Sequence, residues 1–159
     1  MAVLLPGARQ VLTIGGLVLP LPGLKILRAT LTSSAFSGFI DNSFGIAPVA
    51  YTPSGALAFY LRAARGVQST AVSAGNIKIG LHYSDSAVGM NAGAIGANPT
   101  GILSGAAGTS SGVSDWPFTA NSLLPQEMVC GGKVPNGKYP TAQFSSVVGT
   151  VWLYGYEAA

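Results

Sequence analysis

Charged side chains are scarce in this sequence. Asp, Glu, Lys and Arg make up 8% of its 159 residues, against about a quarter in an ordinary soluble domain. The surface must therefore be built largely from Ser, Thr, Asn, Gln, Gly and Ala, and electrostatic repulsion between copies is weak. We expect other protein subunits to cover much of that surface.

The basic residues are too dispersed for a nucleic-acid site. The formal net charge is +3, but phosphate binding requires several cations on one face. The closest groupings are Lys25 with Arg28 and Arg62 with Arg65. We expect no nucleic-acid binding.

A single cysteine and a single histidine leave little scope for redox, metal or covalent chemistry. Cys130 cannot form an intrachain disulfide, and no base is adjacent to it, so we predict a small buried hydrophobe. The chain has five dispersed acids, and with His82 and Cys130 they offer no ligand set with metal-binding spacing. The acids are Asp41, Asp85, Asp115, Glu127 and Glu157. The sequence predicts no metal and no cofactor.

Long hydrophobic runs are also absent. Pro6, Pro20 and Pro22 interrupt the apolar N-terminal region, and no positive segment precedes it, so we expect no signal peptide. The longest uncharged stretch, residues 86–114, is too rich in Gly, Ser, Thr and Asn to form a membrane-spanning helix. We expect a soluble protein made in the cytoplasm.

Two motifs match catalytic signatures without the required context. Residues 108–112 read Gly-Thr-Ser-Ser-Gly, with Ser110 in the nucleophile position, but no strand precedes them, no helix follows, and His82 lies upstream. His82, Ser84 and Asp85 are close in sequence, yet neighbouring strand positions do not orient one another as base and nucleophile. We predict a chain that is not an enzyme, with His82 at a polar strand end.

Hydrophobic alternation and Gly, Pro and Asn punctuation predict an all-β domain. The alternation is clearest over 76–84, and 147–156 carries packing residues on both faces, as a central strand does. Residues 55–65 would suit a helix by their Ala and Leu content, but the flanking Pro53 and Gly66 favour a strand. Further strands are expected at 24–32, 127–134 and 138–144. The pattern indicates an antiparallel sandwich or barrel, and the predicted fold is an antiparallel β-sandwich of jelly-roll or Greek-key type.

Two turn regions complete this expectation. Pro135-Asn136-Gly137 predicts a hairpin between 127–134 and 138–144, because Asn-Gly tolerates positive φ at both central positions. Residues 33–50 contain Phe36, Phe39 and Phe44 and are either a short helical turn or a loop that carries core aromatics. The pattern leaves both possibilities open.

Two segments are expected to contact partners. Residues 1–23 contain three prolines and predict an extended N-terminal arm, which packs on its own domain, 24–159, or on a neighbour. Residues 86–114 predict a long loop, which is uncommon unless functional or ordered by a partner. The contact residues predicted are Arg9, Leu19, Leu21, Lys25, Arg28, Met90, Ile95, Ile102, Leu103 and Trp116.

Three stretches together resemble a tailed-bacteriophage virion protein. They are Leu19-Pro20-Leu21-Pro22, the Gly/Ala/Ser/Asn-rich residues 89–112 and the closing strand 147–156. Within that group the chain is most similar to small head-decoration, or cement, proteins. The resemblance implies a β-sandwich or jelly-roll module, often a trimer, that binds the major capsid protein or other virion subunits and braces the shell against DNA pressure. It also implies a place on the capsid surface after assembly in the host cytoplasm, and no catalytic residues.

The aromatic residues leave a second function open. Trp116, Tyr83 or Tyr154 could stack on sugar in a carbohydrate- or receptor-binding module of a tail fibre or lectin-like protein. Alternating aromatics in strands more often serve core and interface packing. Capsid decoration is therefore the favoured function, the binding module is its alternative, and a hydrolase using Ser110 is the least favoured.

Overall fold

The computed structural model describes residues 11–21, 23–31, 36–42, 49–69, 77–89, 92, 96–102, 114–118, 124–144 and 149–159. Every regular element in these residues is a β-strand, and every strand pairing is antiparallel, which confirms the all-β prediction. No helix in this part of the chain is long and apolar enough to cross a membrane.

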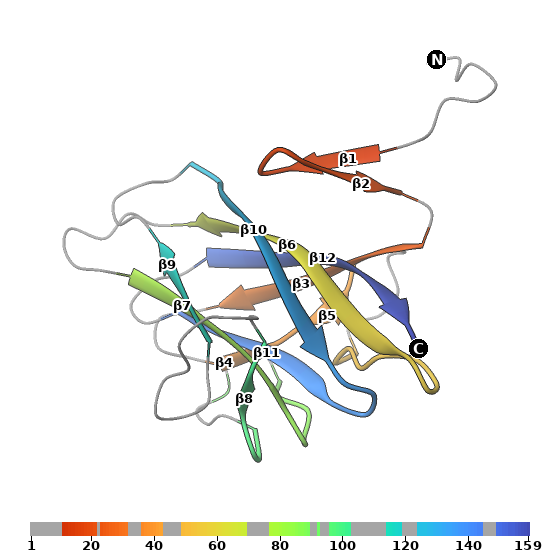
Figure 1. Cartoon of the computed structure of the whole chain (residues 1–159). Helices are drawn as coiled ribbons and strands as arrows, with labels where there is room; N and C mark the ends of the chain where they lie inside the picture. Colours follow the sequence, from red (N-terminus) through yellow and green to blue (C-terminus); the bar gives the residue numbers. More distant parts are fainter. Residues whose placement is uncertain are drawn as a thin grey trace.

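The strands form two five-stranded sheets and one hairpin (Figure 1). Sheet I has the order β10 (Gln126–Val134), β6 (Ala58–Gln68), β12 (Gly149–Ala158), β3 (Leu24–Leu31) and β5 (Ile40–Asp41). Sheet II has the order β4 (Phe36–Gly38), β11 (Tyr139–Phe144), β7 (Ile77–Ser84) and β8 (Thr100–Gly101), with β9 (Ser114–Phe118) also paired to β7. The hairpin consists of β1 (Val11–Ile14) and β2 (Leu17–Pro20).

One hydrophobic core joins the two sheets. Leu27, Phe59 and Leu153 of sheet I and Ile79 and Leu81 of sheet II are all 0% exposed and belong to a single cluster. On β7 these inward side chains alternate with Gly80 and His82, which is the period-two pattern that predicted the strand.

All six strand predictions are confirmed, two of them by β10 and β11. Residues 24–31, 58–68, 77–84 and 149–158 are strands, so the open question between helix and strand at 55–65 is decided for strand. β12 pairs with β3 on one side and β6 on the other, as expected for a central strand. Within 33–50, β4 and β5 flank Phe39, which is 0% exposed, so the described part is extended rather than helical. Phe44 lies outside the described residues.

The predicted hairpin at Asn136-Gly137 is wrong. β10 and β11 are strands, but β10 pairs with β6 in sheet I and β11 pairs with β4 and β7 in sheet II. The Lys138 N–H donates to the Pro135 carbonyl at 3.2 Å, and Gly137 has φ 70° whereas Asn136 does not have positive φ. Positive φ at only the second central residue is a type II turn, whose twist does not match a pair of bonded strands. The turn therefore leads the chain from one sheet to the other.

The N-terminal region also differs from the predicted extended arm. Over residues 11–20 it is a hairpin, in which Ile14 and Leu17 close a two-residue loop. Gly15 and Gly16 have φ 55° and 83°, the type I′ geometry that the right-handed twist of a hairpin requires. Residues 1–10 lie outside the described residues.

The predicted loop at 86–114 is, where described, tied to sheet II. Ala92 bridges Phe36, β8 pairs with β7, and Ser114 begins β9. A Cβ on Gly38 would lie 2.2 Å from the Val88 carbonyl oxygen, which shows how closely this segment crosses β4. The described part is therefore packed onto the domain along much of its course.

Candidate functional site

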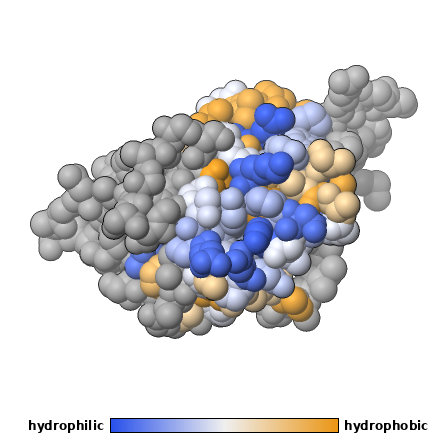
Figure 2. Space-filling model, turned by 60° about the horizontal axis from the view of Figure 1, so that its bottom comes forward, coloured by the Kyte–Doolittle hydropathy of each residue, from blue (hydrophilic) through white to orange (hydrophobic). Residues whose placement is uncertain are grey.

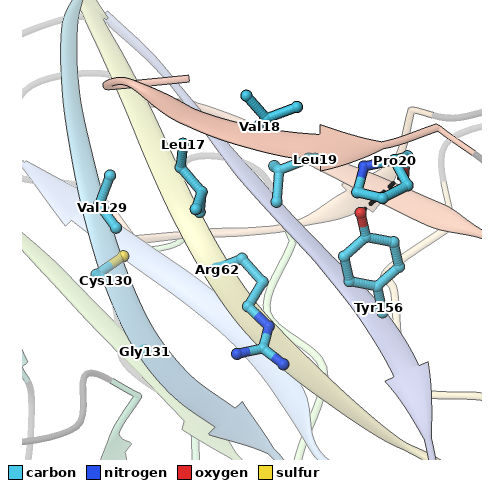
Figure 3. A pocket seen from close by; sticks show the side chains of 9 residues that line it. All are labelled: Leu17, Val18, Leu19, Pro20, Arg62, Val129, Cys130, Gly131 and Tyr156. Atoms are coloured by element: carbon cyan, nitrogen blue, oxygen red, sulfur yellow. Dashed lines mark hydrogen bonds between the residues drawn. The ribbon is translucent and has the colours of Figure 1, made fainter. Parts of the chain in front are cut away.

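A groove of about 450 Å³ opens on the outer face of sheet I, beside the hairpin (Figure 3). β2 forms one wall and β10 forms the other, while β6 and β12 form the floor. The lining residues are Leu17, Val18, Leu19, Pro20, Arg62, Val129, Cys130, Gly131 and Tyr156. Most of this lining is apolar, and Arg62 supplies its only charged side chain.

The hairpin wall is held against sheet I by apolar packing and by two hydrogen bonds. Ile14 and Leu19, each 3% exposed, cluster with Leu24, Ala63 and Tyr154 of the sheet. At the turn, the Gly15 N–H donates to Glu127 Oε2 at 2.6 Å. At the other end, the Tyr156 hydroxyl donates to the Pro20 carbonyl at 2.7 Å. The groove therefore lies beside a wall that is fixed at both ends.

Paired register shifts place Arg62 on the floor of the groove. On β10, Val129 pairs with Ala63 and Gly132 with Leu61, so Cys130 and Gly131 face the single residue Arg62. On β12, consecutive residues Tyr154 and Gly155 pair with Ala63 and Leu61, so Arg62 is unmatched there too. A β-bulge re-aims the side chain at its position. Arg62 is exposed and extends between Gly131 and Tyr156 (Figure 3).

Hydrophobic side chains are exposed around the groove. Val129 on β10 is 54% exposed and Val18 on β2 is 56% exposed. In the hairpin, Leu12, Ile14, Leu17 and Leu19 pack toward sheet I, whereas Val11 and Val18 remain exposed. A two-stranded ribbon that is apolar on both faces leaves one face open to a partner. Another face of the molecule instead carries a central band of hydrophilic side chains (Figure 2).

The carboxylates of the described side chains are all engaged within the chain. Asp41 accepts a hydrogen bond from Lys25 Nζ at 2.8 Å, and Glu127 accepts one from the Gly15 N–H. Asp85 accepts hydrogen bonds from Asn98 at 2.7 Å and from Lys138. Glu157 accepts hydrogen bonds from the Tyr51 hydroxyl at 2.7 Å and from Ser54 Oγ at 2.6 Å. Hydrogen bonds from Asn98 and Lys138 lower the pKa of Asp85. Burial acts to raise the pKa of Glu157, but hydrogen bonds from Ser54 and Tyr51 outweigh it and lower that pKa.

Several cations, by contrast, have no carboxylate partner among the described side chains. Arg28, Arg62 and Lys133 form no ion pair in this part of the chain. Lys133 lies over the Tyr60 ring at 5.4 Å. Arg65 lies over the Trp152 ring at 5.8 Å, and its Nε is 4.0 Å from Glu127. The groove and its surroundings are therefore apolar and positive.

The contact residues predicted from sequence are scattered over the structure. Leu19 lines the groove but is largely covered, Leu21 packs on the hairpin cluster, and Ile102 is a core residue at 3% exposed. Lys25 is already paired with Asp41, and Arg28 is partly buried opposite Trp152. Trp116 belongs to β9, of which only the backbone is described, and Arg9, Met90, Ile95 and Leu103 lie outside the described residues.

Sequence reasoning missed most of the groove. Arg62, Val129 and Tyr156 come from three strands distant in the sequence, and no local motif connects them. One signal was available: Gly15-Gly16 between two apolar runs predicts a hairpin. Of the proposed stacking residues, Tyr154 is 6% exposed and Tyr83 packs against the core.

His82 is not at a polar strand end but is fully buried in sheet II at 0% exposed. Its ring meets Phe36 edge-on with centroids 6.1 Å apart, and Thr141 lies opposite on β11. Neither ring nitrogen has a hydrogen-bond partner among the residues that the structure describes, and burial lowers the pKa of His82 to about 4. Ser84 donates to the Ser86 carbonyl at 2.9 Å. The described neighbours of His82 thus hold it as a neutral side chain at neutral pH.

Cys130 packs against the shared core, and burial raises its pKa to about 12, so it is a thiol rather than a thiolate near neutral pH. Among the described residues, no group of three or more His, Cys, Asp or Glu side chains could hold a metal ion. Residues 103–113, with Ser110 and its glycines, lie outside the described residues.

Comparison of the chain with protein-family models, with curated proteins and with solved structures finds no match.

Proposed function

We propose that this chain is a non-enzymatic structural protein of a virion, a capsid decoration or cement protein that stabilises a phage head by contacts between subunits. In this proposal the two sheets form a β-sandwich of jelly-roll or Greek-key type. The chain assembles as a homo-oligomer, a trimer by the resemblance, and binds the major capsid protein at the capsid surface.

The observation that carries the proposal is the exposed apolar surface of the hairpin and β10. Val11 is 47%, Val18 56% and Val129 54% exposed, in a chain with only 8% charged residues. Exposed apolar patches mark interaction sites, and their removal from water stabilises a complex by about 25 cal/mol per Å². A surface with few charges gains more from such contacts than from ion pairs.

Binding to empty shells of the parent virion tests the proposal. Purified protein is mixed with shells that lack it, and the shells are sedimented and then heated. We expect the protein to co-sediment in a fixed ratio to the capsid subunits and to raise the temperature at which the shells break. A protein that stays monomeric at high concentration and does not bind these shells contradicts the proposal.

A further inference from the structure

The groove between β2 and β10 has walls suited to an apolar side chain. Leu17 faces Val129 across it, and Val129 is 54% exposed (Figure 3). The wall formed by β2 has four residues, which correspond to about 13 Å of extended chain. A partner segment of about four residues therefore fits along this wall.

The floor of the groove adds a cation without a partner. Arg62 is exposed and forms no ion pair within the described part of the chain. The register shifts in β10 and β12 leave it without a paired residue on either neighbouring strand. Lys133 lies two residues beyond Gly131 on the same strand and also has no carboxylate partner there. Glu127, on the same strand β10, already accepts from Gly15 and lies 4.0 Å from Arg65. The groove therefore favours a segment with a carboxylate.

The described carboxylates of this chain are not free to pair with Arg62 of a second copy. Asp41, Asp85, Glu127 and Glu157 are bound within their own chain, so a second copy does not supply a free carboxylate from these residues. Residues 1–10 contain no acid and one arginine. Because these four of the five acids in the chain are engaged, charge complementarity favours a carboxylate from a different protein.

We propose that the groove between β2 and β10 docks an extended acidic segment of a different protein, with an apolar side chain between Leu17 and Val129 and a carboxylate at Arg62. Under the proposed function that protein is a shell subunit. The inference rests on that function for the identity of the partner, but the groove chemistry is tested separately.

Two labelled nonapeptides probe the groove by fluorescence anisotropy at low salt. One alternates valine with glutamate, and the other alternates valine with glutamine. We expect the acidic peptide to bind about fivefold more tightly, which is the size of one partly exposed ion pair. Arg62→Gln should abolish most of this preference. Arg28→Gln is the matched control, because it removes the same charge from β3 and should leave the preference unchanged.

A second variant separates apolar contact from charge. Val129→Thr keeps the β-branched shape and the strand preference but replaces a methyl group by a hydroxyl. It should weaken the binding of both peptides by a similar factor while the acidic preference remains. Thermal unfolding of each variant shows whether the fold is intact.

Several outcomes overturn the proposal. They are equal binding of the two peptides, no measurable binding of either, an equal loss of preference in Arg28→Gln, or self-association that Arg62→Gln abolishes, since the last makes a second copy the occupant. Shell sedimentation keeps the two ideas apart. If wild-type protein binds shells but not the acidic peptide, the groove proposal fails and the proposed function stands. If it binds the peptide but not shells, the reverse holds.

Discussion

The buried histidine predicts a specific dependence of stability on pH. His82 has a folded-state pKa of about 4, with burial as the cause, against 6.5 for the free side chain. As the pH falls below 6.5, His82 binds a proton in the unfolded chain but stays neutral in the folded chain. The contribution of neutral His82 to the free energy of unfolding is therefore complete above pH 6.5 and is lost as the pH falls toward 4. At 1.36 kcal/mol per pKa unit, the full loss is about 3 kcal/mol once the pH is below 4.

Between pH 7 and pH 5 the loss from His82 alone is about 2 kcal/mol. Asp85 and Glu157 change the free energy of unfolding only at lower pH. Their folded-state pKa values are lowered, so the stability that they contribute is lost only as carboxylates protonate near pH 4. The free energy of unfolding is measured in urea by tryptophan fluorescence at both pH values.

Two variants isolate the effect. His82→Phe and His82→Leu remove the titrating ring, so both should lose about 2 kcal/mol less than wild type between pH 7 and pH 5. The smaller leucine guards against overpacking beside Phe36. If wild type and both variants lose the same stability over this window, His82 is not held neutral by burial and the reasoning is refuted.

Three further predictions concern packing, the hairpin and the thiol. Gly38→Ala should lower the free energy of unfolding in urea by about 1–3 kcal/mol, because its Cβ would lie 2.2 Å from the Val88 carbonyl oxygen. The control Gly89→Ala has open space around its Cβ and should leave the free energy of unfolding unchanged. Equal effects of the two variants would contradict the close crossing of Val88 over β4. Tyr156→Phe removes the hydrogen bond to Pro20, so it should cost about 1 kcal/mol and speed amide exchange in β2, and unchanged exchange would count against that anchor. The half-buried Cys130 should react with a maleimide dye at pH 8 far more slowly in native protein than in urea, because a pKa of about 12 leaves roughly one thiolate in 10⁴. Fast native labelling would show that burial does not raise the pKa of this thiol.

The strands could be predicted because their signal is local. On β7, Ile79 and Leu81 alternate with smaller or polar residues, and the period alone defines one buried face. On β12, packing residues on both faces indicated two neighbours, and β3 and β6 are those neighbours. Neither inference requires knowledge of which strands pair.

Strand pairing could not be predicted in the same way. Asn136-Gly137 correctly indicates a reversal, but the sequence does not determine whether Asn136 adopts positive φ. That one dihedral separates a type I′ hairpin turn from the type II turn that carries the chain between sheets. At Gly15-Gly16 the same chemistry does give a hairpin. Burial of Val134 and Thr141 in different sheets favours the crossing over a local pair.

The groove was beyond sequence reasoning because it depends on register. Arg62 is exposed on a floor of packed strands only because β10 has one residue more than β6 opposite it, and β12 one residue fewer. A shift of one residue reverses which face a side chain occupies. The bulge therefore determines the position of the charge, and no composition or spacing rule reports it.

The few charged residues divide into acids that are bonded within the chain and cations that have no carboxylate partner among the described residues. Each of the four engaged acids ties together segments that are far apart in the chain, as Glu127 ties β10 to the Gly15 turn and Glu157 ties β12 to Ser54. The acids therefore hold the fold together, while Arg62 and Lys133 remain available on one face. Two copies that met through this face would bring like charges together, which costs free energy, whereas an acidic partner would gain it. Under the proposed function, self-assembly would therefore use apolar contacts away from Arg62, and the cationic groove would be directed toward a different chain.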